Sequence, residues 1–152
     1  AYYPTYTTTM VGNTVRTTFS GYAYTHAVLA KFDAGGNILW DNCFEMAPRT
    51  RPYYVKRFVS AGVRDGNMAM LFGDGKKIFK KVVSDRDGST LHDRESEILA
   101  TDEENEDVKK ARSTNTQHWF GDCFLVYGNQ IVKNKQTGER RRVAYINKYV
   151  IK

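Results

Sequence analysis

Three histidines are the residues of this 152-residue chain best suited to acid–base chemistry or metal binding. His26, His92 and His118 lie far apart in the sequence, so no local ligand pair of the His-x-His kind exists. No Gly-x-Ser-x-Gly nucleophile elbow occurs. Residues 73–77 (GDGKK) lack the first glycine and the final Ser or Thr of a phosphate-binding loop. We therefore predict a protein that is not an enzyme and that uses no cofactor and no metal ion.

The only two cysteines, Cys43 and Cys123, leave two alternatives open. Both lie in strand-like runs, WDNCFEM and WFGDCFLVY. A disulfide between them would close a loop of about 80 residues and stabilise the fold by about 4 kcal/mol. The other interpretation is a pair of buried free thiols that act as small apolar side chains.

The run Asp85-Arg86-Asp87-Gly88-Ser89 is similar to the opening of a calcium-binding loop. Such a loop needs a bidentate Glu at its twelfth position, and Ser96 stands there. We therefore interpret the run as an ordinary Asp-Gly turn.

The elements that must position these residues are strands, because apolar residues alternate with period two through most of the chain. Residues 27–32 and 38–46 flank Gly-Gly-Asn and predict a hairpin. Further strands are expected at residues 5–10, 14–20, 53–63, 68–72, 77–83, 119–127, 130–133 and 141–151. About nine or ten short strands favour an all-β, predominantly antiparallel sandwich, barrel or partial propeller-like sheet.

Residues 84–115 differ from the rest, because they are polar and carry an acidic run followed by basic residues. This order favours either a solvated loop or a short helix near residues 100–112, aligned with its own dipole. We expect a single β-rich domain over residues 1–152, with residues 84–115 as a polar insertion.

Aromatic and basic residues are the candidates for a binding surface. Ten Tyr, eight Phe and two Trp make the chain rich in rings, and the net charge of +6 permits acidic partners. The rings would either fill the core or stack on sugars or bases. The candidate surface residues are Trp40, Tyr53, Tyr54, Trp119, Tyr127, Lys76, Lys77, Arg140, Arg141 and Arg142.

Two groups of residues resemble a pattern in uncharacterised envelope and secreted proteins of Bacteroidetes-type bacteria. The first group is Phe19, Gly21, the run AYTHAV at 23–28, Phe32-Asp33, Gly36-Asn37 and Leu39-Trp40-Asp41. The second group is Trp119, Phe124-Leu125, Tyr127-Gly128, Gln130, Asn134 and the run YINK at 145–148. The resemblance implies an exported protein, either the C-terminal part of a longer precursor or one member of an envelope assembly. It implies no assigned activity and no functional residue.

These observations lead to one functional prediction and two alternatives. We predict a non-enzymatic module of the bacterial cell envelope that binds protein partners as an accessory or structural subunit. Its location would be extracytoplasmic: the periplasm, the outer-membrane surface or the medium. The alternatives are a carbohydrate-binding module that uses exposed aromatic residues, and nucleic-acid binding, which rests on charge alone. No window reaches the roughly 18 apolar residues of a membrane-spanning helix.

Overall fold

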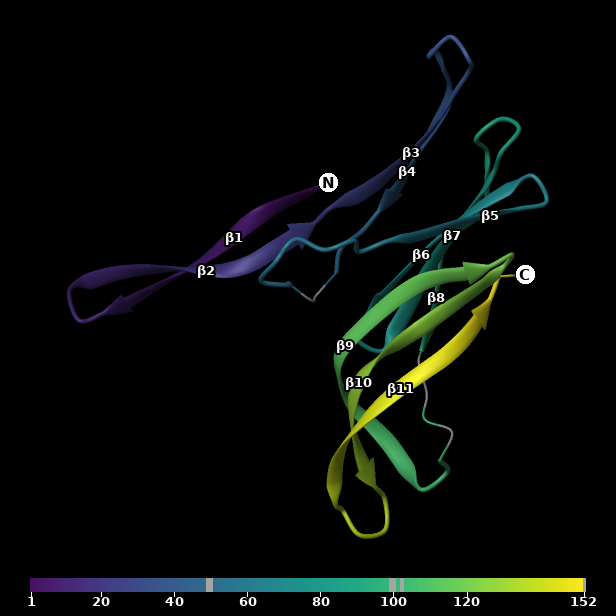
Figure 1. The fold of residues 1–152 in the computed structure, drawn as a ribbon. Coiled ribbons are helices and arrows are strands. Elements are labelled where there is room, and N and C mark those ends of the chain that lie inside the picture. The colour runs from purple at the N-terminus through teal and green to yellow at the C-terminus, as the bar shows by residue number, and fades with distance from the viewer. Residues whose placement is uncertain (49–50, 99–100, 102, 152) are drawn as a thin grey trace.

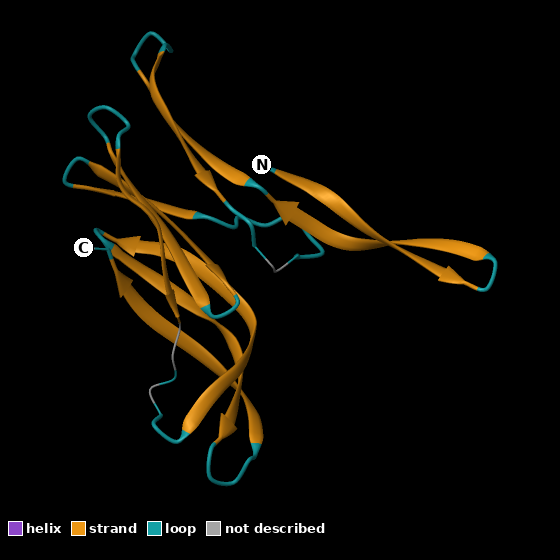
Figure 2. Ribbon diagram, turned by 180° about the vertical axis from the view of Figure 1, so that it is seen from behind, coloured by secondary structure: helices purple, strands orange, loops and turns teal. Residues whose placement is uncertain are grey.

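The structure is a computed structural model that describes residues 1–48, 51–98, 101 and 103–151, leaving out the side chains of residues 64 and 94–98. Every regular element in this part of the chain is a strand, which confirms the all-β prediction (Figure 2). The strands are β1 (Tyr2–Val11), β2 (Thr14–Tyr24), β3 (His26–Phe32), β4 (Ile38–Glu45), β5 (Ser60–Arg64), β6 (Asn67–Asp74), β7 (Lys77–Ser84), β8 (Thr90–Ile98), β9 (Glu106–Phe120), β10 (Cys123–Asn134) and β11 (Arg140–Val150).

The strands form four antiparallel sheets, each built from neighbours in sequence (Figure 1). They are the hairpins β1–β2 and β3–β4, the four-stranded sheet β5–β6–β7–β8 and the three-stranded sheet β11–β10–β9. Short turns make this possible. For example, Asp65 and Gly66 join β5 to β6 with φ angles of 50° and 74°, the two positive values that a type I′ turn needs.

The sheet β5–β8 is the middle of three layers, because its central strand β6 is buried on both faces. Met70 and Phe72 pack into a first core with Trp40 and Phe44 of the hairpin β3–β4. Leu71, between them, points the other way into a second core. The second core is shared with the sheet β9–β11 and contains Leu71, Ile78, Val82, Phe124, Val126 and Ile151. The layers of antiparallel sheet agree with the sandwich alternative.

The predicted hairpin at residues 27–46 is confirmed as β3–β4. Polar side chains attach it to the middle sheet. The Lys31 ammonium lies 2.7 Å from Asp85 Oδ2, and Lys81 donates to the Cys43 carbonyl at 2.6 Å. Asn42 donates to the Gly88 carbonyl at 2.8 Å.

Small residues let β9 lie directly against β5 and β6. A Cβ atom on Gly73 would come within 2.2 Å of the Thr114 methyl group, and one on Gly62 within 2.4 Å of the His118 ring. Ser60 donates to the Thr116 carbonyl at 2.6 Å, so a side chain satisfies a main-chain group at the edge of β9. On this side of the sandwich, β9 therefore packs directly against β5 and β6.

The hairpin β1–β2 extends away from these layers as an arm whose turn, Gly12-Asn13, points outward (Figure 1). Its base is attached through residues 51–59. Tyr22 N donates to the Pro52 carbonyl at 2.9 Å, and the Tyr24 hydroxyl both donates to the Lys56 carbonyl and accepts from Lys56 N. The Tyr24 ring stacks on Phe58 with centroids 4.8 Å apart.

The expectation for residues 84–115 is wrong where the structure describes them. Most of this segment lies in β8 and in the first part of β9, with no helix near residues 106–112. Pairing with neighbouring strands decides this, because β8 joins β7 and β9 joins β10 along their lengths. Residues 99, 100 and 102 of the expected loop or helix lie outside the described residues.

Candidate binding surfaces

A polar groove lies where the connection before β5 meets β9. Its cavity volume is about 550 Å³, within the usual range for small-molecule sites. Its lining residues are Tyr54, Lys56, Arg57, Ser60, Ala61, Asn115, Thr116, Gln117, His118 and Tyr127. They include two phenol rings, the basic side chains of one Lys and one Arg, two side-chain amides and no carboxylate.

Lys56 is the central charge of this groove. Its ammonium donates to Asn115 Oδ1 at 2.9 Å and lies 5.4 Å from the centre of the Phe58 ring. No carboxylate of the described residues pairs with it. Burial removes water from the half-buried ammonium and lowers the pKa of Lys56 below its ordinary value. The groove therefore favours a ligand that brings a negative charge.

One face of the arm carries an apolar stripe of residues from β1 and β2, interrupted once by the hydrogen-bonded pair Thr8–Thr17. Rings contact one another along its inner half, with centroid distances of 5.8 Å for Tyr6–Phe19 and 5.2 Å for Phe19–Tyr22. Met10 opposes Val15 near the tip. Tyr6, Met10 and Val15 are 62%, 75% and 63% exposed. The apolar stripe consists of Tyr2, Tyr6, Met10, Val15, Phe19 and Tyr22.

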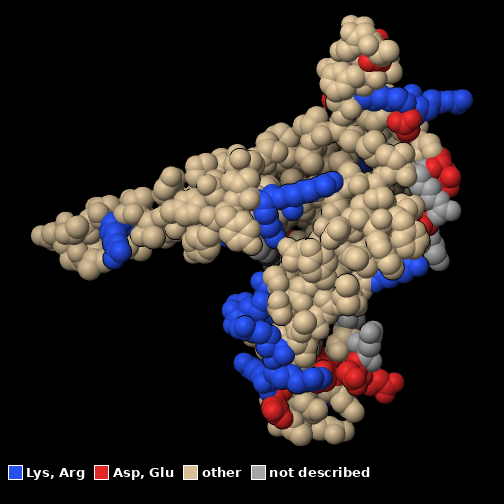
Figure 3. All heavy atoms as spheres, in the orientation of Figure 1, with Lys and Arg blue, Asp and Glu red and all other residues tan. Residues whose placement is uncertain are grey.

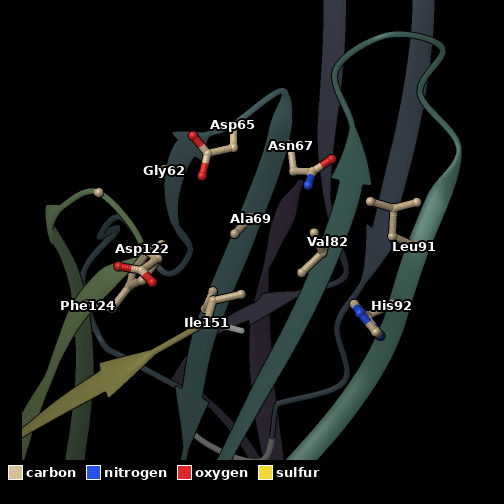
Figure 4. Close-up of a pocket in the computed structure, with 11 residues that line it drawn as sticks. Gly62, Asp65, Asn67, Ala69, Val82, Leu91, His92, Asp122, Phe124 and Ile151 are labelled. Atoms are coloured by element: carbon tan, nitrogen blue, oxygen red, sulfur yellow. The ribbon is translucent and has the colours of Figure 1, made fainter.

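A third feature is an apolar cleft of about 320 Å³ at one end of the second core (Figure 4). Phe124 and Ile151 belong to its floor and also to that core. Asp65 and Asp122 lie on the β5 side of the cleft and His92 on the β8 side. We interpret the cleft mainly as the open end of the second core.

The five aromatic candidates occupy different environments in the structure. Trp40 is 9% exposed and belongs to the first core, so its prediction as a surface residue is wrong. Tyr54 and Tyr127 come together in the groove. Tyr53 is 71% exposed and contacts Phe19 at the base of the arm. Trp119 is exposed at the end of β9, beside Phe120.

The basic candidates lie near the starts of β7 and β11, where acidic residues are interspersed (Figure 3). Lys76 donates to the Val108 carbonyl, and Arg141 pairs with Glu106 at 2.8 Å. Lys77, Arg140 and Arg142 are exposed. Mixed charges weaken the electrostatic attraction to phosphates that nucleic-acid binding requires.

The remaining reactive residues are dispersed over several sheets. The three histidines lie on β3, β8 and β9. Cys43 is free and exposed on β4, and Cys123 is free and buried on β10, so the two do not pair in this structure. Among the residues that the structure describes, no three His, Cys, Asp or Glu side chains gather as a metal site would require.

The fold and these surfaces define an all-β protein of stacked antiparallel sheets with a projecting hairpin arm. No family model, curated protein or solved structure matches the chain. The described residues contain no helix that could span a membrane.

Sequence reasoning missed most residues of two exposed surfaces, the apolar stripe of the arm and the polar groove. The arm had a signal, since Arg16 is the only Asp, Glu, Lys or Arg among residues 1–30. For the groove, the sequence pointed only to the rings Tyr54 and Tyr127. Lys56 and Asn115 gave no signal, because they belong to segments far apart in the sequence. Only their tertiary contact reveals them.

Proposed function

We propose that this chain is a non-enzymatic, β-rich module of the bacterial cell envelope that joins a larger assembly through the arm β1–β2. The observation that supports this proposal is the exposed apolar stripe on an almost uncharged hairpin. The envelope location rests on the sequence resemblance. The partner is another protein with an apolar, weakly charged strand edge or groove.

The physical argument begins with the cost of exposing the stripe. A two-stranded hairpin alone in water is marginally stable, and Met10 and Val15 gain nothing from the body of the protein. Covering them would remove apolar area from water, at about 25 cal/mol per Å². A partner on this face would therefore stabilise the arm as well as the complex.

The edges of the arm support the same proposal. In the described chain, β1 and β2 pair only with each other, so each has an outer edge with unpaired main-chain groups beyond the base. Proteins usually protect such edges with lysines, prolines or bulges. Here Pro4 and a bulge between Thr5 and Tyr6 protect the base, and no lysine lies in the arm. An open edge beside apolar side chains suits strand addition to a partner.

The experiment is site-specific photo-crosslinking in the native envelope, with the photoreactive residue at Val15. We expect crosslinks to one envelope protein, identified by mass spectrometry. Met10→Lys should lower the yield of this crosslinked pair about tenfold, because it places a charge in the apolar contact. The adjacent Thr9→Lys, on the opposite face, is the matched control and should leave the yield within about twofold.

Two outcomes would overturn the proposal. Crosslinks only between copies of this chain would replace the heterologous partner with self-assembly. Equal loss from Met10→Lys and Thr9→Lys would show that the apolar stripe does not make the contact. Both positions are exposed, so neither variant should change the unfolding temperature.

A further inference from the structure

We infer that the groove between residues 54–57 and β9 is a binding site for an anionic saccharide, a sugar chain that carries carboxylate or sulfate groups. This inference is independent of the arm, because it concerns a separate surface and a different class of ligand.

Rings and amides of the groove match the two kinds of surface on a sugar. Tyr54 is 70% exposed and Tyr127 37% exposed, so both rings can cover the apolar C–H face of a pyranose. Sugar hydroxyls both donate and accept hydrogen bonds, and the amide side chains of Asn and Gln offer strong donors and acceptors together. Asn115 and Gln117 supply two such amides at this site.

The charges of the groove require an acidic group on the sugar. Lys56 and Arg57 supply two positive charges, and no Asp or Glu lines the groove. Arg57 Nε donates to the Val59 carbonyl at 3.1 Å, which leaves the other guanidinium nitrogens for a ligand. A neutral sugar would leave the half-buried Lys56 ammonium without a counter-charge.

The groove is also held in place before any ligand arrives. The Tyr24 hydroxyl fixes both main-chain groups of Lys56, and the Lys56 ammonium reaches β9 through Asn115. Thr116 and Ser60 hydrogen-bond each other at 3.2 Å beneath it. Sites built before binding avoid the entropic cost of ordering.

Two other anionic ligands fit the chemistry less well. A single-stranded nucleic acid carries a phosphate at each nucleotide and requires a continuous basic track, whereas this groove has two cations in about 550 Å³. An acidic peptide would use the two cations but has less need of paired amides beside exposed rings. Both ligands serve as competitors in the test.

The experiment is calorimetric titration of the whole chain with two probes, a galacturonic acid trisaccharide and a heparin-derived tetrasaccharide. We expect at least one probe to bind, and its neutral counterpart, the methyl ester or the desulfated sugar, to bind about tenfold more weakly. Tyr54→Ala and Arg57→Gln should each weaken binding about tenfold, whereas the neighbouring Tyr53→Ala, outside the groove, should not.

The result that would overturn the inference is equal binding of charged and neutral sugars, or binding of neither probe. Tighter binding of hexaglutamate or of a thymidine dodecamer would assign the groove to another ligand class. Tyr54→Ala should leave the unfolding temperature unchanged, so lost binding would not reflect lost folding. Met10→Lys in the arm should bind the sugar normally, which separates this inference from the proposed function.

Discussion

The indole nitrogen of Trp40 donates a hydrogen bond to the main-chain carbonyl of Asp85 at 3.0 Å, across the boundary between two sheets. The same ring lies against Gly88, where a Cβ atom would come within 2.8 Å of it. Trp40 therefore fills the first core and also holds the turn between β7 and β8 against the hairpin β3–β4.

We expect Trp40→Ala to lower the free energy of unfolding by about 3–5 kcal/mol, because it opens a cavity in the first core and removes this hydrogen bond. Trp119→Ala is the matched control, since Trp119 is 56% exposed, and should cost no more than about 1 kcal/mol. Urea unfolding followed by circular dichroism measures both. Similar losses for the two variants would contradict the core position of Trp40.

Gly128 lies where β10 passes close to the backbone of β9. A Cβ atom there would lie 1.9 Å from the Ser113 carbonyl oxygen, a main-chain atom that cannot move independently. We expect Gly128→Ala to destabilise the fold by about 1–3 kcal/mol through overpacking. Gly35→Ala meets only side-chain atoms of Asp33 and Asn37, at 3.3 Å, and should change stability by less than about 1 kcal/mol. Calorimetric unfolding temperatures would measure both effects. An unchanged unfolding temperature for Gly128→Ala would show that β9 and β10 are further apart at this point.

The two cysteines should react differently. Cys43 is exposed and Cys123 buried, so a thiol reagent should modify one cysteine per native chain and both after denaturation. Cys43→Ser should abolish the native reaction. If the oxidised protein instead shows no free thiol when unfolded without reductant, the cysteines form the disulfide that the sequence left open.

Asp33 should titrate below its ordinary range. The Asn37 side chain donates to its carboxylate at 2.9 Å, and the main-chain N–H groups of Asn37 and Gly35 donate at 2.8 Å. These bonds, the Asn37 side chain first, favour the charged form and lower the pKa of Asp33 below 3.8. The stabilisation is therefore present above pH 3.8 and is lost as the pH falls through the lowered pKa.

Nuclear magnetic resonance of the carboxyl carbon measures this pKa directly. Asn37→Ala removes only the side-chain donor, so we expect the pKa of Asp33 to rise toward 3.8. An unchanged pKa in this variant would mean that the Asn37 side chain does not hold the carboxylate in solution.

The sequence by itself determined many of the strands and turns, because their signals are local. It was wrong for the strand expected at residues 119–127, which the turn at residues 121–122 divides between β9 and β10. It was also wrong for most of residues 53–63, since β5 begins only at Ser60. Alternation over residues 27–46 predicted β3–β4, with Trp40 and Phe44 on one face, since successive strand residues point to opposite sides. The same local logic misled at residues 106–112, where charge order suited a helix dipole. Pairing with β10 outweighed that weak preference.

Tertiary structure decided which aromatic residues are core and which are surface. Trp40 and Trp119 lie in similar strand-like runs, yet only Trp40 faces a second sheet. Tertiary structure also created the groove, because it brings Lys56, before β5, into contact with Asn115 on β9. Burial depends on what packs above a strand, and contacts between distant segments depend on how sheets stack; neither quantity is contained in the local pattern of residues.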